Sequence, residues 1–209
     1  MNKSFIHPLV ALTLFVCSTG YAGEYNEVLN IGDSMPGFTK LPTTDETTLS
    51  SADIKESVVV LVSLANHCPW VRGMDGDLVK LAKTFEGKDV RIIGFNVSHR
   101  EDDRLPAMKE HAKKNGYNFT YVYDDSQALG RALGAARTPE YFVFDKDRKL
   151  VYMGLLYNSP AAMRDGKVTH INGTPSDFYV QDAITSTLEG KPVKNAETRA
   201  HGCSVKYES

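Results

Sequence analysis

The sequence has no surplus of charge of either sign. Lysine and arginine number 24 against 26 aspartate and glutamate, which gives a formal net charge of -2. No stripe of basic residues marks a surface for nucleic acid or for an anionic membrane. Internal repeats and low-complexity tracts are also lacking. A chain of 209 residues with 42% hydrophobic content is long enough for one packed domain, and two would be cramped.

Long apolar runs are missing as well, since no segment approaches the roughly 18 consecutive apolar residues that a membrane-spanning helix needs. A shorter apolar stretch over 9–16 follows a lysine and precedes small residues. This order is typical of a secretory signal peptide, here residues 1–22, cut after Ala22. A lipoprotein signal built on Cys17 is the alternative, but Val16 stands where a small residue is wanted. We therefore expect a periplasmic or secreted protein without a lipid anchor.

Cysteine is scarce. The chain has three, and removal of the signal peptide takes Cys17 with it. The mature protein then retains Cys68 and Cys203 in a compartment where disulfides form and persist, so we expect the two to form a pair. A glycine-rich phosphate-binding loop after a strand is also absent, and no organic cofactor is indicated.

The hydrophobic pattern predicts an α/β domain over residues 23–190. Residues 38–50 alternate around a proline and suit a small β-hairpin at the edge of the domain. Residues 57–65 (SVVVLVSLA) form a near-continuous apolar run, as expected for a strand buried on both faces. Pro69 fits the first turn of a helix whose apolar residues recur at helical spacing as far as Gly87.

Strands and helices alternate along the rest of the domain. We expect strands over 90–97 and 119–124, helices over 106–116 and 126–135, and a hairpin over 140–154. Residues 156–172 show little periodicity and predict a long loop. Thr174 and Pro175 can begin a last helix that ends at Gly190. This order of elements predicts α/β layers with crossover helices.

The segment NHCPWVRG, residues 66–73, places Cys68 where the apolar strand leads into the helix. A thiol at a helix N-terminus has a lowered pKa, because the helix dipole and free N–H groups stabilise the thiolate. His67 beside it and Arg72 one turn away can add positive charge. A buried structural cysteine is the alternative, but such cysteines do not usually stand at this kind of junction between a histidine and a proline. We therefore expect Cys68 to be a reactive nucleophile.

Two stretches carry a family resemblance: VVVLVSLANHCPWVRG over 58–73 and ARTPEYFVFDKDRKLVYMG over 136–154. They resemble the thioredoxin-like superfamily, and more closely its redoxin branch related to alkyl hydroperoxide reductase and thiol-specific antioxidant proteins. The resemblance covers nearly the whole mature chain. It implies a thioredoxin-like fold, with a central mixed β-sheet flanked by helices and an N-terminal β-hairpin extension. It also implies that Cys68 attacks and that Thr138-Pro139, joined by a cis peptide bond, faces it.

Two departures from the family pattern narrow the function that the resemblance implies. Val71 fills the position of the second cysteine in Cys-x-x-Cys, so a disulfide within the helix is excluded. Peroxiredoxins place a threonine three residues, and a proline seven residues, before the attacking cysteine, where this chain has Ala65 and Leu61. A peroxide would lack the threonine hydroxyl that orients it. We therefore expect thiol-disulfide exchange with protein or small-molecule thiols first, and peroxide reduction second.

The C-terminal tail, residues 191–209, is polar and lacks a core-forming run, which predicts a mobile segment. Its GCSVKY, residues 202–207, resembles the Gly-Cys-Ser-x-Lys-aromatic tail of a subgroup of redoxins that shares an NHCP motif. Cys203 can then be the resolving thiol that releases a mixed disulfide or sulfenic acid from Cys68. A permanent disulfide is the alternative, since closing so long a loop stabilises a protein by roughly 5 kcal/mol in the chain-entropy model.

A metal site is the alternative from another functional class. His67, Cys68, His201 and Cys203 offer two imidazoles and two thiolates, which suit copper(I) or zinc. Against this, adjacent residues do not easily face one ion, and the His-x-Cys spacing of the tail fits no tight motif. We therefore expect a redox site without a metal. The residues expected to shape its substrate groove are His67, Pro69, Trp70, Arg72, Thr138 and Pro139.

Overall fold

The structure is a computed structural model that describes residues 23–208. The predicted signal peptide, residues 1–22 with Cys17, lies outside the described residues. Within residues 23–208, no helix is both long enough and apolar enough to cross a bilayer. The predicted edge hairpin is confirmed, because β1 (Leu41–Pro42) pairs antiparallel with β2 (Thr48–Leu49).

Five strands form the central sheet, in the order β5-β4-β3-β7-β8. They are β3 (Val58–Ser63), β4 (Val90–Asn96), β5 (Thr120–Tyr123), β7 (Glu140–Phe144) and β8 (Leu150–Gly154). The first three run parallel, whereas β7 runs antiparallel to both of its neighbours. The sheet is therefore mixed, as expected, and each of these strands lies where the sequence pattern predicts one.

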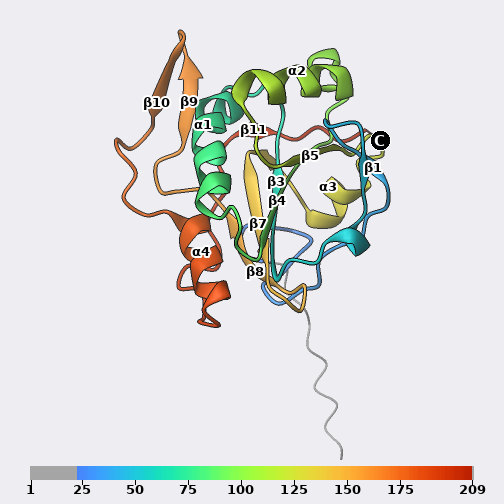
Figure 1. The fold of residues 1–209 in the computed structure, drawn as a ribbon. Helices are drawn as coiled ribbons and strands as arrows, with labels where there is room; N and C mark the ends of the chain where they lie inside the picture. The colour runs from blue at the N-terminus through green and yellow to red at the C-terminus, as the bar shows by residue number, and fades with distance from the viewer. Residues whose placement is uncertain (1–22, 209) are drawn as a thin grey trace, which may run out of the picture.

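Strand β3 is buried on both faces because successive side chains point to opposite sides of the sheet. Val58, Val60 and Val62 belong to one core cluster, and Val59 and Leu61 belong to the other. The helices are α1 (Pro69–Thr84), α2 (Leu105–Asn115), α3 (Ala128–Leu133) and α4 (Tyr179–Leu188). Figure 1 shows α1 and α4 on one side of the sheet and α3 on the other. Burial of each of these five β3 side chains, four valines and one leucine, stabilises the fold by about 1.5–3 kcal/mol.

The segment predicted as a long loop over 156–172 contains a β-hairpin instead. Strand β9 (Ala161–Arg164) pairs antiparallel with β10 (Lys167–His170) around a turn in which Asp165 and Gly166 both have positive φ. Figure 1 shows the hairpin beside α1. Gly73 of α1 allows close packing there, since a Cβ would lie 2.6 Å from the Ala161 carbonyl oxygen. The sequence pattern does not predict this hairpin, because the alanines that fill the narrow contact with α1 have a low preference for β-strands.

The last helix begins later than predicted, at Tyr179 instead of near Thr174 and Pro175. The Asn158 side chain accepts hydrogen bonds from the backbone N–H groups of Ser176 (3.1 Å) and Asp177 (3.4 Å). These bonds hold the chain before the helix in a loop conformation. The expected helix start therefore gives way to a long-range contact that local capping signals do not contain.

The last described residues of the chain lie against the domain and do not extend away from it. We call residues 196–208 the strap. Its first part binds β8 through two backbone hydrogen bonds, Met153 N–H to Ala196 O (2.9 Å) and Thr198 N–H to Met153 O (3.0 Å). Its second part contains β11 (Cys203–Ser204), and Figure 1 shows this dark red segment crossing the top of the molecule. Hydrogen bonds hold the strap, so a hydrophobic pattern does not reveal it.

Candidate active site

Cys68 lies between the end of β3 and the start of α1. It is the N-cap residue of the helix, with Pro69 as the first helical residue, as predicted. The side chain is 0% exposed, and its thiol donates a hydrogen bond of 3.1 Å to the carbonyl oxygen of Thr138. The Thr138-Pro139 peptide bond is cis, which confirms the expectation drawn from the family resemblance.

The strap brings the second cysteine to the first. Strand β11 pairs antiparallel with β6 (Arg137–Thr138), and this register places Cys203 opposite Thr138. The Sγ atoms of Cys68 and Cys203 are 2.7 Å apart, and both cysteines are free thiols. A disulfide joins its sulfurs at about 2.05 Å, so a shift of less than about 1 Å closes the pair. Cys203 is only partly buried and covers Cys68.

A glycine makes this close approach possible. A Cβ on Gly202 would lie 2.1 Å from the carbonyl oxygen of Thr138. After Cys203, the Tyr207 hydroxyl donates to the Ala135 carbonyl (2.7 Å) and its ring lies 4.7 Å from the Arg131 guanidinium. Three positions of GCSVKY therefore have a visible structural reason: the glycine permits the close approach, the cysteine supplies the thiol, and the tyrosine anchors the segment.

The surroundings of Cys203 favour the protonated form of its thiol. Burial raises the pKa of the Cys203 thiol to about 12, and its hydrogen bond with Cys68 adds to this increase. Cys203 is therefore protonated at neutral pH. Since the thiolate is the attacking form, Cys203 has to lose its proton to a base before it attacks another sulfur.

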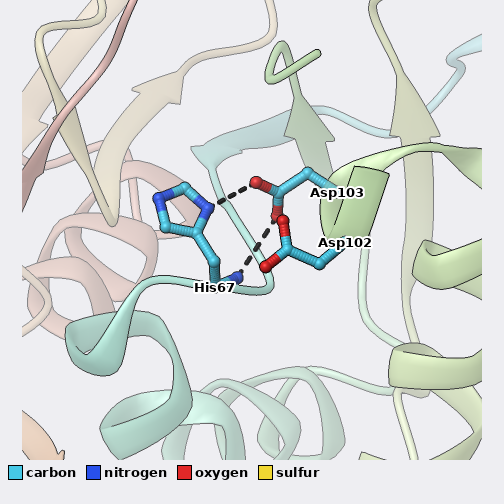
Figure 2. Close-up of side chains that lie close together, drawn as sticks. All are labelled: His67, Asp102 and Asp103. Carbon is cyan, nitrogen blue, oxygen red and sulfur yellow. Dashed lines mark hydrogen bonds and ion pairs between the residues drawn. The ribbon is translucent and has the colours of Figure 1, made fainter. Parts of the chain in front are cut away.

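The residue before Cys68 makes contacts that the sequence pattern does not predict. His67 binds the buried Asp103 twice: Nδ1 contacts the carboxylate, and the backbone N–H donates to it at 3.3 Å. Figure 2 shows the imidazole ring facing this carboxylate. Asp103 ends the short 3-10 helix η2 (Glu101–Asp103), which follows β4. The one available signal was topological, because parallel β3 and β4 end at the same edge of the sheet.

The four residues of the alternative metal site are not brought together. Among residues 23–208, the one group of three such side chains whose ligand atoms all lie within 4.8 Å is His67, Asp102 and Asp103. His201 instead packs edge-on against Trp70, with ring centroids 4.4 Å apart. Asp102 already forms an ion pair with Arg100 at 2.9 Å, so this cluster is explained by contacts within the protein.

The predicted groove residues divide into two groups. Thr138 and Pro139 are buried beneath the cysteines. Pro69 and Arg72 are exposed on the first turn of α1, and Trp70 there is half-buried. The first turn of α1 therefore forms the solvent-exposed border of the site.

A pocket of about 360 Å³ opens beside Thr138 and Ser204, which adjoin the two cysteines. Its wall includes Ala65, His67, Thr138 and strap residues 204–208. The Thr138 hydroxyl is buried and has no hydrogen-bond partner within residues 23–208. The pocket therefore places polar residues next to residues that adjoin the two cysteines.

Comparisons with known proteins agree with this architecture. A family model described as Redoxin matches residues 30–176. An uncharacterized conserved protein from Geobacillus kaustophilus is 30% identical, with a TM-score of 0.77 over 88% of this chain and 95% of its own. A hypothetical protein from Sinorhizobium meliloti 1021 is 26% identical, with a TM-score of 0.75 over 88% of this chain and 98% of its own.

A more distant structure, the thioredoxin domain of a thiol-disulfide oxidoreductase from Bacteroides vulgatus, is 22% identical. Its TM-score is 0.53, and the match covers 61% of this chain and 89% of that one. This likeness confirms the predicted thioredoxin-like fold. A search of curated proteins finds no match.

Proposed function

The chain belongs to the Redoxin family, and from this premise we propose that it is an exported thiol-disulfide oxidoreductase whose redox pair is Cys68 and Cys203. The observation that carries the proposal is the 2.7 Å separation of the two sulfurs, which lie 135 positions apart in the chain. Val71 occupies the place of a nearby second cysteine. The strap supplies that second thiol from the far end of the chain.

The exchange passes two electrons from the cysteine pair to a disulfide in a partner. The Cys68 sulfur attacks one partner sulfur, the partner's S–S bond breaks, and one partner thiol leaves. Cys203 then loses its proton and attacks the Cys68 sulfur of the mixed disulfide, which forms the Cys68–Cys203 disulfide and releases the second partner thiol. The reverse sequence oxidises a partner dithiol. The partner is a protein or a small-molecule thiol or disulfide.

The burial of the two sulfurs determines which of them a partner meets. Cys68 is covered by Cys203, so the strap has to move before Cys68 can attack an external disulfide. In the reverse direction, an external thiolate attacks the Cys68 sulfur of the disulfide and the Cys203 thiolate leaves, which again requires the strap to open. We therefore assign residues 23–190 to the thioredoxin-like domain and residues 191–209 to a tail that opens and closes over its thiol.

Export rests on the signal-peptide pattern of residues 1–22 and on the chemistry of the pair, since disulfides form and persist outside the reducing cytosol. Peroxide reduction is the second candidate. Ala65 in the pocket wall offers no hydroxyl to a peroxide, but the same wall contains Thr138, whose buried hydroxyl has no hydrogen-bond partner within residues 23–208. That hydroxyl is the one observation that favours a peroxide.

The test uses the reduced mature protein and its Cys203→Ser and Cys68→Ser variants. Each is exposed to oxidised glutathione or hydrogen peroxide, quenched with N-ethylmaleimide and analysed by non-reducing mass spectrometry. We expect the wild type to form the Cys68–Cys203 disulfide and Cys203→Ser to accumulate a glutathione adduct at Cys68. Cys68→Ser should form neither.

If Cys68 of the reduced wild type stays unmodified by either oxidant, the redox function is wrong. A purely structural disulfide would also contradict the proposal, and the reduction potential identifies it. Structural disulfides lie below about -300 mV, whereas catalytic ones lie above this value.

A further inference from the structure

A buried carboxylate supports the histidine that precedes Cys68. The Asp103 side chain is 0% exposed, whereas that of His67 is 29% exposed. The contacts of Asp103 come from donors: the backbone N–H and ring of His67, and the Asn96 amide at 3.5 Å. Arg100 Nε lies 4.0 Å from the same carboxylate. An ionised carboxylate accepts hydrogen bonds and donates none, so this set of donors suits an ionised Asp103.

The carboxylate fixes which ring nitrogen of His67 can accept a proton. Because Asp103 only accepts, Nδ1 must carry the hydrogen and Nε2 must be the free acceptor. Figure 2 shows Nε2 turned away from Asp102 and Asp103. No hydrogen-bond partner for Nε2 occurs in the described part of the chain, residues 23–208. A buried aspartate orients the histidine of hydrolase triads in the same way.

His67 lines the pocket together with residues that adjoin the two cysteines. Thr138, whose carbonyl accepts the Cys68 hydrogen bond, lines the same pocket, and so does Ser204, which follows Cys203. In the proposed reaction, a thiol proton reaches His67 along this wall, through water held in the pocket. The pocket therefore lies between the histidine and residues that adjoin the two sulfurs.

The other charged groups of the pocket are already engaged. His99 has both ring nitrogens in hydrogen bonds, to the Glu208 carboxylate at 2.6 Å and to the Asp125 carbonyl at 2.7 Å. Arg100 is paired with Asp102. The Lys206 side chain ends in an ammonium group, which donates hydrogen bonds and cannot accept a proton. His67 is therefore the base in this wall with an unoccupied nitrogen.

We propose that His67 is the general acid–base of the cysteine pair and that Asp103 is its positioning residue. This inference rests on the redox function proposed above. As the Cys68 sulfur attacks the partner disulfide, its proton passes to Nε2 of His67 and then to the leaving partner thiolate. As Cys203 attacks the mixed disulfide, its proton follows the same route to the second leaving thiolate. Two protons accompany two electrons, and His67 ends neutral.

The first test is His67→Gln in the reduced full-length mature protein. The measurement is the rate of oxidation by oxidised glutathione from about pH 5 to pH 9, followed by thiol trapping. General acid–base catalysis contributes about 10²–10⁴-fold, and we expect a fall of about 100-fold. We also expect the imidazole inflection of the pH profile to disappear. The variant keeps the backbone N–H bond to Asp103, and its melting temperature is measured alongside so that a loss of stability is separated from a loss of rate.

The second test compares two neighbouring aspartates. Asp103→Asn should slow the reaction about tenfold, because an amide does not fix Nδ1 as the protonated ring nitrogen as a carboxylate does. Asp102→Asn, its exposed neighbour, should leave both the rate and the inflection unchanged. If Asp103→Asn does not fold, His67→Gln decides alone.

A wild-type rate and pH profile in His67→Gln would overturn the inference, and so would equal effects of the two aspartate variants. The Cys68→Ser variant separates this failure from failure of the redox function. If Cys68→Ser consumes glutathione disulfide as the wild type does, the redox pair itself is wrong. If only the His67 variants behave as the wild type, the acid–base role alone is wrong.

Discussion

The two cysteines of the pair are held by different kinds of structure. Cys68 joins β3 to α1, and both elements belong to the main hydrophobic core. Cys203 lies on a strand of two residues within the strap. Individual hydrogen bonds attach the strap near it, together with the partly buried side chains of Val205 and Tyr207, which pack against the edge of a core cluster.

This difference separates global from local stability. A segment that unfolds only with the core opens as rarely as the whole protein unfolds, whereas a segment held by a few hydrogen bonds opens far more often. Cys68 is therefore a fixed sulfur and Cys203 a detachable one. A Cys-x-x-Cys motif places both sulfurs at one helix start, and this chain instead gives the second sulfur independent movement. The following predictions test that contrast, from the largest expected effect to the smallest.

Leu78→Ala tests the fixed region. Leu78 of α1 is 1% exposed in the core that supports Cys68, and such truncations lower the free energy of unfolding by about 2–5 kcal/mol. Denaturant unfolding followed by circular dichroism measures the loss. Val168→Ala, at a side chain that is 51% exposed, is the control and should change it by less than about 0.5 kcal/mol. If Leu78→Ala exposes Cys68 to alkylation without lowering the free energy of global unfolding, the region around Cys68 opens by local unfolding, and the contrast with the strap is wrong.

Gly202→Ala tests the detachable region. The added Cβ would meet the Thr138 carbonyl, and overpacking of this kind costs about 1–3 kcal/mol. Because the strap can move away, the cost should displace Cys203 and leave the domain folded. We expect disulfide formation between Cys68 and Cys203 to slow by about 5- to 150-fold, as measured by thiol trapping.

The control for this variant is Gly76→Ala, a glycine of α1 whose added Cβ meets nothing within 4 Å. It should leave the rate of disulfide formation unchanged. A large drop in melting temperature for Gly202→Ala with an unchanged rate would show that the strap is part of the global fold.

The same contrast explains what the sequence could predict. The strand before Cys68 and the helix after it follow from an apolar run and a helical period, so the fixed half of the site was foreseeable. The strap was not, because its position depends on backbone hydrogen bonds and on the close approach at Gly202. GCSVKY indicated that Cys203 matters through family resemblance, and gave no distance to Cys68.

Asp103 and the β9–β10 hairpin were missed for a related reason. Asp103 lies in a polar run that predicts only a solvated loop, and its burial depends on which strands are neighbours. The hairpin carries an Asp-Gly turn signal at 165–166, but its short strands contain alanines that pack on α1. Both features depend on contacts between distant segments, which local periodicity does not encode.

Tyr207→Phe removes one attachment of the strap. The hydroxyl donates to the Ala135 carbonyl, and loss of such a bond costs about 0.5–1.5 kcal/mol. We expect Cys68 to be alkylated about twofold to tenfold faster, because alkylation requires the strap to open. Tyr25→Phe, at an exposed tyrosine, is the control and should not change the rate. An unchanged rate in Tyr207→Phe would mean that the strap opens elsewhere.

The smallest expected effect is the pH dependence of the strap. His99 contacts Glu208 at the end of the strap, and this hydrogen bond, followed by that to the Asp125 carbonyl, raises the pKa of His99 above 6.5. A raised pKa means that the protonated ring binds the closed strap more strongly. The stabilisation is therefore fully present below about pH 6.5 and is lost as the pH rises through the raised pKa.

The ratio of Cys68 alkylation rates in wild type and His99→Gln isolates this contribution, since ionisation of the thiol affects both proteins alike. Exposed ion pairs are weak, so at about pH 6 the wild type should react roughly twofold more slowly than the variant. At about pH 9 the two rates should converge, because the wild-type histidine is then neutral. A ratio that stays constant across this range, or that moves in the opposite direction, would mean that the Glu208 contact does not help to close the strap. The detachable sulfur would then depend on the other contacts of the strap, among them its backbone pairing with β6 and the Tyr207 hydroxyl.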